Sequence, residues 1–538
     1  MKKRSLLTVV MALAVGIVGA FGLTACDNRG PRSDQTVIKM MGWGDIYETR
    51  IFETMIDMFE DEHPEYYVEY NPIGGNDYML KFMQAVQNRR EMPDVFYMAD
   101  YNFVRYMTDT DVFEDLTPYI EASPNLGKDD LYEESVYAYS YNKETKTFGD
   151  TENGGLYGLP KDLGPTVFIY NKDMAEDAGI TVDRSVAKGY DPTTKKLNDQ
   201  VPMTWAQYIA FASDISNSIT SKHVYGGGSY PIELAYNVFG KNFTALDADG
   251  HSYIDVNNKE FAEALQFFSD IQNKNIFSSG KDKRSLVCSQ EEQASVSGLN
   301  RFIAGEAATV FTGAWNTTSL WECIYDWDIL PTPVPNESGD LKDVDSPARE
   351  GCESVSFLGS VCLSVYSGSK VKEGAYLLAE YLSTNVDAQR YNYKAGMAIP
   401  NLRTLEEEYL TAELNDPLGM NRPQNRQVYL NALKNSPRRA EAYTWDGEWT
   451  TEFFNCSSQN YKYSLQHVYR VDSIIDSYAP NYVVWDWDTK SITTSPTTND
   501  SSASLAGVVS GQEFLSNFQS EIQKLIDENS DKYKFVVR

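Results

Sequence analysis

A tryptophan stands directly after a short apolar segment in the stretch 301–321, which reads RFIAGEAATVFTGAWNTTSLW. Residues 307–312 are apolar and partly β-branched, which predicts a buried strand, and residues 313–316 then turn the chain. Ligands bind at the carboxyl ends of strands in open α/β sheets, where a large aromatic ring can form a pocket wall. Tryptophan is also highly buried on average. This pattern alone therefore leaves Trp315 as either a pocket wall or a core residue.

Two other predicted strands also end in aromatic and acidic residues. Residues 36–41 predict the first strand, and the loop that follows it contains Trp43 and Asp45. Residues 93–98 predict the third strand, with Asp100 and Tyr101 at its end. Because the chain has 77 Asp and Glu residues, a single carboxylate is a weak indication of catalysis.

The sequence does not support the common cofactor and metal motifs. No GxGxxG or GxxxxGK[ST] follows the first strand, so neither a dinucleotide site nor a P-loop is expected. Residues 247–250 (DADG) match the start of a calcium loop, but its twelfth position is Asn258, and a hairpin turn is the simpler interpretation. With 4 His and no CxxC, a zinc site is not expected, and we expect no cofactor. The cysteines beyond Cys26 are Cys288, Cys323, Cys352, Cys362 and Cys456, whose pairing, if any, cannot be read from the sequence.

The pattern of strands and helices predicts an α/β fold. The amino-terminal part alternates between strands at 36–41, 66–70 and 93–98 and amphipathic helices at 49–63 and 77–88. Such an alternation is typical of a parallel sheet with crossover helices. Further predicted elements are a strand at 166–170, a helix capped by Thr204, a helix at 261–271, a helix end at 301–304 with Gly305 as its stop, a strand at 355–366, and helices at 375–382 and 512–526.

Length and charge restrict the class of protein. The chain has 538 residues, 42% of them hydrophobic, which is enough for two or three domains with cores of their own. The formal net charge is −30. A chain this acidic repels phosphates and anionic lipid headgroups, so nucleic acid and a directly bound membrane surface are not expected as partners.

The amino terminus predicts export and lipid attachment. Basic residues 2–4 precede an apolar segment at 6–21 that is too short for a confident membrane span. Residues 23–26 (LTAC) then resemble a bacterial lipobox, although an ordinary signal peptide with a chance cysteine would look similar. We expect residues 1–25 to be a signal peptide, Cys26 to carry a lipid such as palmitate, and 26–35 to be a tether. The folded part would then lie on the extracellular face of a bacterial cell membrane.

Several passages line up with one known family. In chain order they are FETMIDMFEDEHPEYYVEY, MPDVFYMADYN, YGLPKDLGPTVFIYNKDM, FIAGEAATVFTGAW, LSVYSGSKVKEGAYLLAEYLS and AGMAIP. Together they resemble the extracellular solute-binding proteins of carbohydrate ABC importers, the maltose-binding type. The resemblance covers about residues 36–400, and the last third of the chain matches less well.

The resemblance implies a two-lobed fold. Each lobe would be a mostly parallel sheet flanked by helices, with a ligand cleft between the lobes and crossings near Gly164, Gly359 and Ala440. The first lobe would hold residues 36–163 and 359–438, and the second 164–358 and 439–538. The implied function is to capture a carbohydrate, in particular an oligosaccharide, to close the lobes over it, and to deliver it to an ABC transporter permease. The protein would be a monomer without catalytic activity.

The resemblance also implies specific ligand contacts. Trp315 matches the family's stacking tryptophan in the second lobe, and Asp100 matches an acidic residue that binds hydroxyls. Trp43 and Asp45 match the first-lobe loop that contacts the ligand. The remaining matches are Tyr101 beside Asp100, Tyr230 in a second-lobe loop, and Trp445 and Trp449 near the third crossing.

Other functions stay open at this point. The same fold hosts many ligands, so a polyamine or a peptide is an alternative to a sugar. A surface glycoside hydrolase would need two carboxylates on either side of a glycosidic bond, one of them with a raised pKa. A structural adhesin is a weaker alternative because the sequence has no internal repeat of 20–50 residues.

Overall fold

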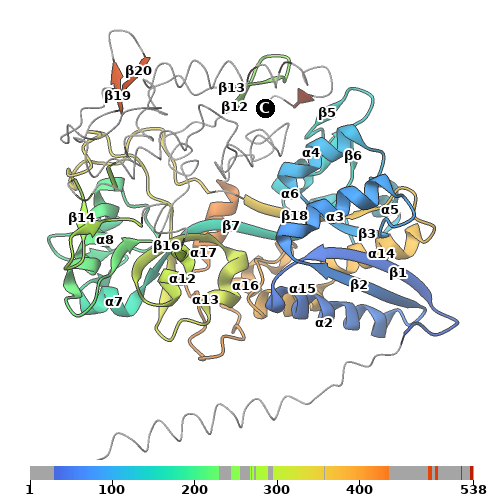
Figure 1. Ribbon diagram of the computed structural model, residues 1–538, viewed down its shortest axis with the longest axis horizontal. Coiled ribbons are helices and arrows are strands. Elements are labelled where there is room, and N and C mark those ends of the chain that lie inside the picture. The colour runs from blue at the N-terminus through green and yellow to red at the C-terminus, as the bar shows by residue number, and fades with distance from the viewer. Residues whose placement is uncertain are drawn as a thin grey trace, which may run out of the picture.

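The computed structural model contains two bodies of helices and strands, with long strands running from one into the other (Figure 1). It describes residues 30–228, 244–254, 267, 270–271, 274, 276–288, 295–356, 358–435, 483–486, 491–494, 523, 527 and 534–536. We call the body around β1, β2 and β3 the first lobe, and the body around β11, β16 and β17 the second lobe.

One mixed sheet of eight strands extends through both lobes. Seven strands lie in the order β11-β16-β7-β18-β3-β1-β2, and β17 also pairs with β7. The strands are β1 Thr36–Trp43, β2 Tyr66–Ile73, β3 Val95–Ala99, β7 Leu159–Asn171, β11 Tyr225–Gly227, β16 Ala307–Gly313, β17 Trp327–Leu330 and β18 Leu358–Val365. β1, β2 and β3 are parallel, as predicted, whereas β18 is antiparallel to both β3 and β7.

Strand β7 connects the two lobes. Its first half pairs with β18 from Leu159 to Pro165, and its second half pairs with β16 and β17 from Thr166 to Asn171. All 13 of its residues are buried. The sequence predicted only residues 166–170 of this strand, because the preceding Lys161, Asp162 and Gly164 are typical of a loop.

Helices cover the sheet, and their bounds agree with most of the predicted ones. The α-helices in the described part are α2 Ile46–Glu62, α3 Gly75–Gln87, α4 Asp100–Asp109, α5 Thr117–Ala122, α6 Glu133–Ala138, α7 Lys172–Asp177, α8 Trp205–Ser218, α12 Gly298–Ile303, α13 Thr317–Leu320, α14 Lys372–Thr384, α15 Val386–Lys394, α16 Glu406–Thr411 and α17 Gln427–Lys434. The 3₁₀ turns are η1 Lys128–Asp130, η2 Ala314–Asn316 and η3 Arg403–Leu405. The helices α14 and α15 pack against α2 (Figure 1).

Local signals explain where several elements begin and end. Thr204 caps α8 in a capping box with Gln207, as the sequence predicted for the Thr. Gly305 has a φ of 67° just after α12, which confirms the predicted stop because glycine adopts this conformation without a Cβ clash. Gly250, with a φ of 86°, forms the predicted hairpin turn between β12 Thr244–Leu246 and β13 Ser252–Ile254.

The junction between β1 and α2 differs from the prediction. β1 continues two residues beyond 41, and Trp43 is its last residue, paired with Ile73, rather than part of a loop. The helix begins at Ile46 because the Asp45 side chain accepts hydrogen bonds from the backbone N–H groups of Tyr47 and Glu48. Asp45 is therefore the N-cap of α2.

Smaller sheets flank the main one. β4 Ser140–Asn142, β5 Thr147–Phe148 and β6 Gly155–Leu156 form a sheet that β21 Lys534–Phe535 joins through β5. The others are the sheet of β8 Thr181–Val182, β10 Lys196–Leu197 and β9 Tyr190–Asp191, and the pairs β14 Ser278–Ser279 with β15 Arg284–Ser285 and β19 Val483–Asp486 with β20 Ser491–Thr494. Most of the predicted helices at 261–271 and 512–526 lies outside the described residues.

The side chains of β7 alternate between two hydrophobic clusters. Phe168 and Tyr170 belong to the larger cluster, whereas Leu163, Val167 and Ile169 belong to the smaller one. Successive side chains of a strand point to opposite faces of its sheet. The two clusters are thus the cores on the two faces of the central strand.

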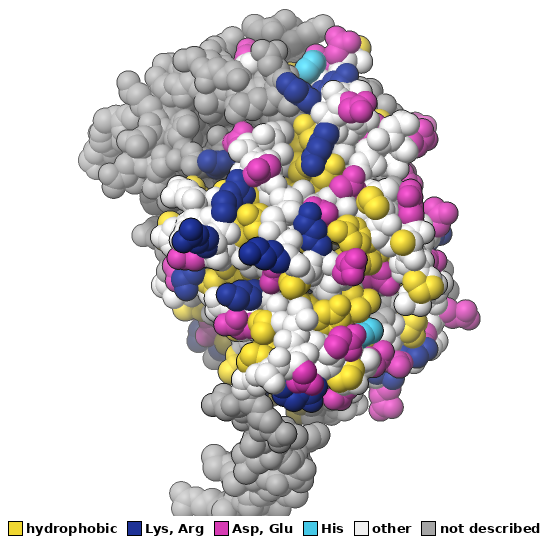
Figure 2. Space-filling view, turned by 90° about the vertical axis from the view of Figure 1, so that its right-hand side faces the viewer, with side chains coloured by type: hydrophobic (Ala, Val, Ile, Leu, Met, Phe, Trp, Pro, Cys, Tyr) yellow, Lys and Arg dark blue, Asp and Glu magenta, His cyan; other side chains and the backbone are white. Residues whose placement is uncertain are grey.

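Charged side chains of both signs lie on the face of the first lobe (Figure 2). Figure 2 shows the side of the molecule that carries the first lobe, where acidic and basic side chains are interspersed with hydrophobic ones. Within the described residues, Cys288, Cys323 and Cys362 are buried and Cys352 is partly exposed. Cys456 lies outside them.

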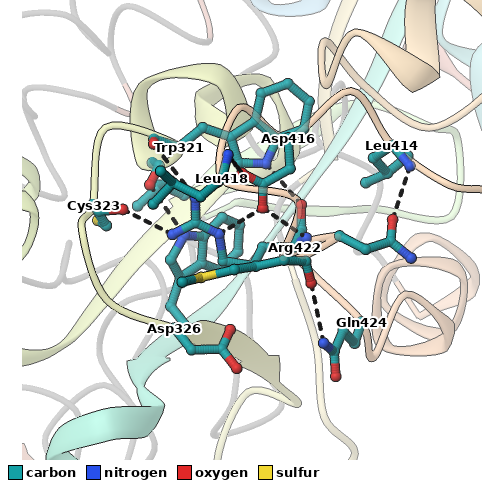
Figure 3. Close-up of polar contacts among 12 residues, drawn as sticks. Trp321, Cys323, Asp326, Leu414, Asp416, Leu418, Arg422 and Gln424 are labelled. Atoms are coloured by element: carbon teal, nitrogen blue, oxygen red, sulfur yellow. Dashed lines mark hydrogen bonds and ion pairs between the residues drawn. The ribbon is translucent and has the colours of Figure 1, made fainter. Parts of the chain in front are cut away.

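A buried arginine ties the segment before α17 to the second lobe (Figure 3). Arg422 and Asp416 are both fully buried, and the Arg422 Nε lies 2.7 Å from Asp416 Oδ2. Arg422 Nη1 also donates to the carbonyl oxygens of Cys323 and Tyr325, at 2.9 and 2.7 Å. In return, the indole N–H of Trp321 donates to the carbonyl oxygen of Arg422 at 2.8 Å. The guanidinium thus has partners from two distant parts of the chain.

The same segment also contacts strand β17. Asp328 accepts hydrogen bonds from the backbone N–H groups of Gln424 and Asn425, at 3.0 and 2.9 Å. Residues 416–425 are therefore fixed against second-lobe elements. Ala440, the predicted third crossing, lies outside the described residues, and the predicted division of the chain between the lobes stays a prediction.

We expect Arg422→Met to destabilise the protein strongly. The substitution leaves Asp416 as a buried carboxylate without its cation, and removing one partner of a buried pair typically costs about 3–5 kcal/mol. Urea unfolding measures this loss. Arg89→Met is the control, because Arg89 pairs with Asp111 at the surface and such pairs contribute less than about 1 kcal/mol. Equal effects of the two substitutions would contradict the anchoring role of Arg422.

Candidate functional site

Strand ends from both lobes converge at the centre of the sheet. Ala99, the last residue of β3, pairs with Val361 of β18. Gly313, the last residue of β16, pairs with Thr166 of β7. The facing residues Gly164 of β7 and Gly359 of β18 lie between these two points. Gly359 is two residues from Val361, and Gly164 is two residues from Thr166. The residues that follow β3 and β16 therefore start on either side of the same strand pair.

Trp315 lies at this convergence. It belongs to the turn η2 that follows β16 directly, and its side chain is half-buried. The six-membered part of its indole lies over the backbone of three glycines, Gly313, Gly164 and Gly359. Gly164 and Gly359 are the β7–β18 pair between the two strand ends. The prediction of a large aromatic just past the carboxyl end of a strand is thus confirmed.

The indole N–H of Trp315 differs in its hydrogen bonding from those of the two following tryptophans, Trp321 and Trp327. The N–H of Trp321 donates to the carbonyl oxygen of Arg422, and that of Trp327 donates to the carbonyl oxygen of Leu320 at 3.0 Å. Within the part of the chain that the structure describes, the N–H of Trp315 has no such partner. A half-buried tryptophan with a free donor is suited to hold a polar ligand.

Trp43 ends β1 on the first-lobe side and is supported by two tyrosines. Its ring packs edge-on against Tyr78, with centroids 4.7 Å apart, and against Tyr97, at 5.4 Å. Tyr78 is held in turn by a 2.7 Å hydrogen bond to the carbonyl oxygen of Tyr97. The half-buried Trp43 ring therefore has a fixed orientation.

The acidic residues predicted from the sequence occupy two helix starts. Asp100 is the first residue of α4 and is only 2% exposed. A carboxylate in the first turn of a helix is stabilised by the N–H dipoles there. Tyr101 is the second residue of α4. Asp45 uses Oδ1 to cap α2, at 2.8 Å from the N–H groups of both Tyr47 and Glu48, so only its other oxygen is left for a ligand.

Sequence reasoning missed a buried ionic cluster beside these residues. Lys161 of β7 is 1% exposed, and its Nζ pairs with Glu48 Oε1 at 2.5 Å and with the Asp162 carboxylate. Burial alone would lower the pKa of Lys161, but Asp162 and Glu48 outweigh this effect and raise the pKa above its ordinary value. The rings of Phe52 and Tyr97 lie 5.0 and 5.1 Å from the ammonium nitrogen.

A hydrogen bond also joins the two lobes at the surface. The hydroxyl of Tyr47, in the first turn of α2, donates to Glu322 Oε1 at 3.2 Å. Glu322 follows α13 of the second lobe, and its carboxylate raises the pKa of Tyr47 above the ordinary value. The two lobes are thus in direct side-chain contact here.

Four of the predicted residues are not among those that the structure describes. Tyr230, Trp445, Trp449 and Cys26 lie outside the described residues. Among the described residues, no group of three or more His, Cys, Asp or Glu side chains is arranged to hold a metal ion. In that same part of the chain, no helix has the length and apolar character needed to cross a bilayer.

The model of one protein family matches most of the chain. It is the model of the bacterial extracellular solute-binding proteins, and it matches residues 54–417 of the 538. The chain belongs to this family. The family resemblance predicted from the sequence is therefore confirmed, and the fold is the two-lobed one of these binding proteins.

Curated relatives are similar over part of their length. The maltodextrin-binding protein MdxE of Bacillus subtilis is 26% identical over 203 residues, which are 36% of this chain and 42% of that protein. The galactooligosaccharide-binding protein of Bacillus subtilis is 24% identical over 258 residues, 47% of this chain and 51% of that protein. The chain thus spans about half or less of the relatives it matches.

Solved structures share the fold of this solute-binding protein. A substrate-binding protein of Listeria monocytogenes in complex with cycloalternan has a TM-score of 0.63 at 18% identity, covering 92% of this chain and 100% of that one. The acarbose-binding GacH receptor of Streptomyces glaucescens has a TM-score of 0.58 at 15% identity, covering 93% and 100%. At this identity the likeness concerns the fold.

We expect Lys161→Met to destabilise the protein in a pH-dependent way. Without the ammonium, Glu48 and Asp162 are adjacent carboxylates with no cation between them, and the pKa of Glu48, which burial already raises, lies above that of the unfolded chain. The folded state then binds more protons, so the free energy of unfolding falls as the pH rises above about 4. Urea unfolding should give a loss of about 3–5 kcal/mol at pH 8 and a smaller loss at pH 5.

The double variant Lys161→Met with Glu48→Gln serves as the control for charge. It removes one of the two carboxylates and should recover part of the stability at pH 8. A loss that is the same at both pH values, or no recovery in the double variant, would show that the ionic cluster does not act through its charges.

Proposed function

We propose that this protein is the substrate-binding component of an ABC importer that captures an oligosaccharide outside the cell. In this proposal the lobes close over the sugar, and the closed protein delivers it to the membrane permease. Membership of the extracellular solute-binding family supports the proposal, as do relatives named for binding maltodextrin and galactooligosaccharide. The observation that carries it is the half-buried ring of Trp315 where the strand ends of both lobes converge.

The chemistry of this region suits a carbohydrate. A sugar ring has apolar C–H faces that stack on aromatic rings, and hydroxyl groups that donate to carboxylates. Trp315 and Trp43 are half-buried aromatics at strand ends of the second and first lobes. Asp100 and Asp45 add carboxylates at the neighbouring helix starts. We propose that the protein binds the sugar as a monomer and without a cofactor.

The proposed ligand contacts are those predicted from the sequence. We include Trp315, Trp43, Asp100, Asp45, Tyr230, Tyr101, Trp445 and Trp449. The hydrogen bond from Tyr47 to Glu322 supports closure, because it can form only while the first turn of α2 is close to the end of α13. The proposed lobes are residues 36–163 with 359–438, and 164–358 with 439–538.

The proposal excludes catalysis. The named relatives are binding proteins, and three carboxylates near the proposed site, Asp100, Asp162 and Glu48, are used at a helix start or in ion pairs with Lys161. Incubating the purified protein with maltodextrins and galactooligosaccharides, followed by chromatography, tests this point. Appearance of shorter sugars would replace the binding function by a hydrolase.

We expect a panel of oligosaccharides to identify a ligand that raises the melting temperature, because a ligand bound only by the folded state stabilises it. Trp315→Ala should then raise the Kd of that ligand roughly tenfold to hundredfold in calorimetry, through loss of the stacking surface. Trp315→Phe should retain part of the affinity. If polyamines or peptides stabilise the protein and no sugar does, the ligand class is wrong; an unchanged Kd removes Trp315 from the site.

We also propose that Cys26 anchors the protein to the outer face of the cell membrane through a lipid. In cells fed labelled palmitate, the protein should carry the label and sediment with membranes. Cys26→Ser should remove the label and release the protein into the medium, because one polar side chain supplies no membrane anchor. An unlabelled wild-type protein would instead indicate an ordinary signal peptide.

A further inference from the structure

The indole ring of Trp315 lies very close to the backbone of three glycines. A Cβ atom added to Gly164 would lie 2.4 Å from Cε3 of the indole, and one added to Gly359 would lie 2.4 Å from Cζ3. At Gly313 the corresponding distance to Cζ3 is 1.9 Å. All three atoms would overlap the six-membered part of the ring. We call Gly164, Gly313 and Gly359 the glycine platform.

Backbone conformation does not explain the two strand glycines. Neither Gly164 nor Gly359 has a φ in the left-handed region, where glycine is favoured. Both lie in regular antiparallel pairing and face each other across β7 and β18. Glycine inside a strand weakens it and often marks a place where another group approaches closely. Here the approaching group is the indole of Trp315.

Two of these glycines, Gly164 and Gly359, lie on the strand pair β7–β18 that connects the lobes. β7 pairs with β18 up to Pro165 and with β16 from Thr166 onward, so Gly164 lies next to the point where its partner changes. Trp315 itself follows β16. The ring of one lobe therefore rests on the strand pair that leads into the other.

We propose that Gly164 and Gly359 are positioning residues for Trp315, which set the place and tilt of its ring for the sugar. The role as a sugar platform rests on the proposed function. Because ordinary contacts are 3.4–4 Å, a methyl group at either position would push the ring by about 1 Å toward the ligand. In enzymes, a misplacement of about 1 Å can lower the rate roughly a hundredfold, and we expect a displaced ring to stack less well on the sugar.

A competing explanation is that the glycines serve only as flexible joints between the lobes. A joint would matter whether or not Trp315 is present, since its effect arises from the backbone. A platform matters only while the ring rests on it. The two explanations are therefore separated by substituting the glycines in proteins with and without Trp315.

The test uses the single variants Gly164→Ala and Gly359→Ala. Each is made once in the protein that keeps Trp315 and once together with Trp315→Ala. The control is Gly374→Ala on helix α14. Its added Cβ would lie 2.5 Å from the ring of Tyr66, and Trp315 is not among its nearest neighbours. The first readout needs no ligand: protein labelled with 5-fluorotryptophan is studied by fluorine NMR, with the Trp315 resonance assigned by its loss in Trp315→Ala. Both platform variants should shift this resonance, and the control should leave it in place.

The second readout is binding of maltotriose by calorimetry. We expect Gly164→Ala and Gly359→Ala to raise the Kd tenfold or more when Trp315 is present, and less than twofold in the Trp315→Ala protein. An unchanged fluorine resonance overturns the platform, as does an equal loss of affinity in both backgrounds. If wild-type protein binds neither maltotriose nor other oligosaccharides, the proposed function fails, while the fluorine shift still decides whether the glycines position the ring.

A measurement of stability tests the proposal even if a glycine variant does not fold. If Gly164→Ala does not fold because the methyl group cannot be accommodated, the proposal requires the double variant Gly164→Ala with Trp315→Ala to fold as stably as Trp315→Ala alone. A double variant that also fails to fold overturns the proposal, since the clash would then not involve the ring.

Discussion

The pairing of β7 with β18 is the constraint on which the rest of the structure depends. β7 is buried along its whole length, and it exchanges one set of partners for another midway. Both lobes are therefore built on one continuous set of backbone hydrogen bonds. The strand ends that carry Trp315 and Asp100 come together because β16 and β3 are attached to opposite sides of this pair. The convergence of these strand ends is a consequence of strand order, not of any local motif.

Much of the framework was readable from the sequence, because it depends on local periodicity and on caps. The parallel strands of the first lobe, the capping box at Thr204 and the stop at Gly305 each depend on neighbours within a few residues. The position of Trp315 after a strand was predicted for the same reason, because an apolar strand followed by a turn is a local pattern. The N-cap role of Asp45 was also within reach, since a capping residue three positions before Glu48 is a recognised start signal.

The features that were missed depend on partners far away in the chain. Lys161 looks like a loop residue until Glu48, 113 positions earlier, neutralises it inside a strand. Nothing in the sequence around Arg422 indicates burial, yet its side chain is fully buried. It donates hydrogen bonds to carbonyl groups about 100 residues earlier in the chain. In both cases a charge is stable in the interior only because its partners surround it. Sequence patterns carry no information on such pairings without the fold.

The place of β18 in the sheet has a consequence for how the chain folds. This strand lies between β3 and β7, yet Leu358–Val365 follows Val95–Ala99 by more than 250 residues. The first lobe cannot complete its sheet until the residues between β3 and β18 have been synthesised, and until then β3 has an open edge. Contacts of such long range form slowly. The sheet of the first lobe can therefore close only after residue 365 of the 538 has been made.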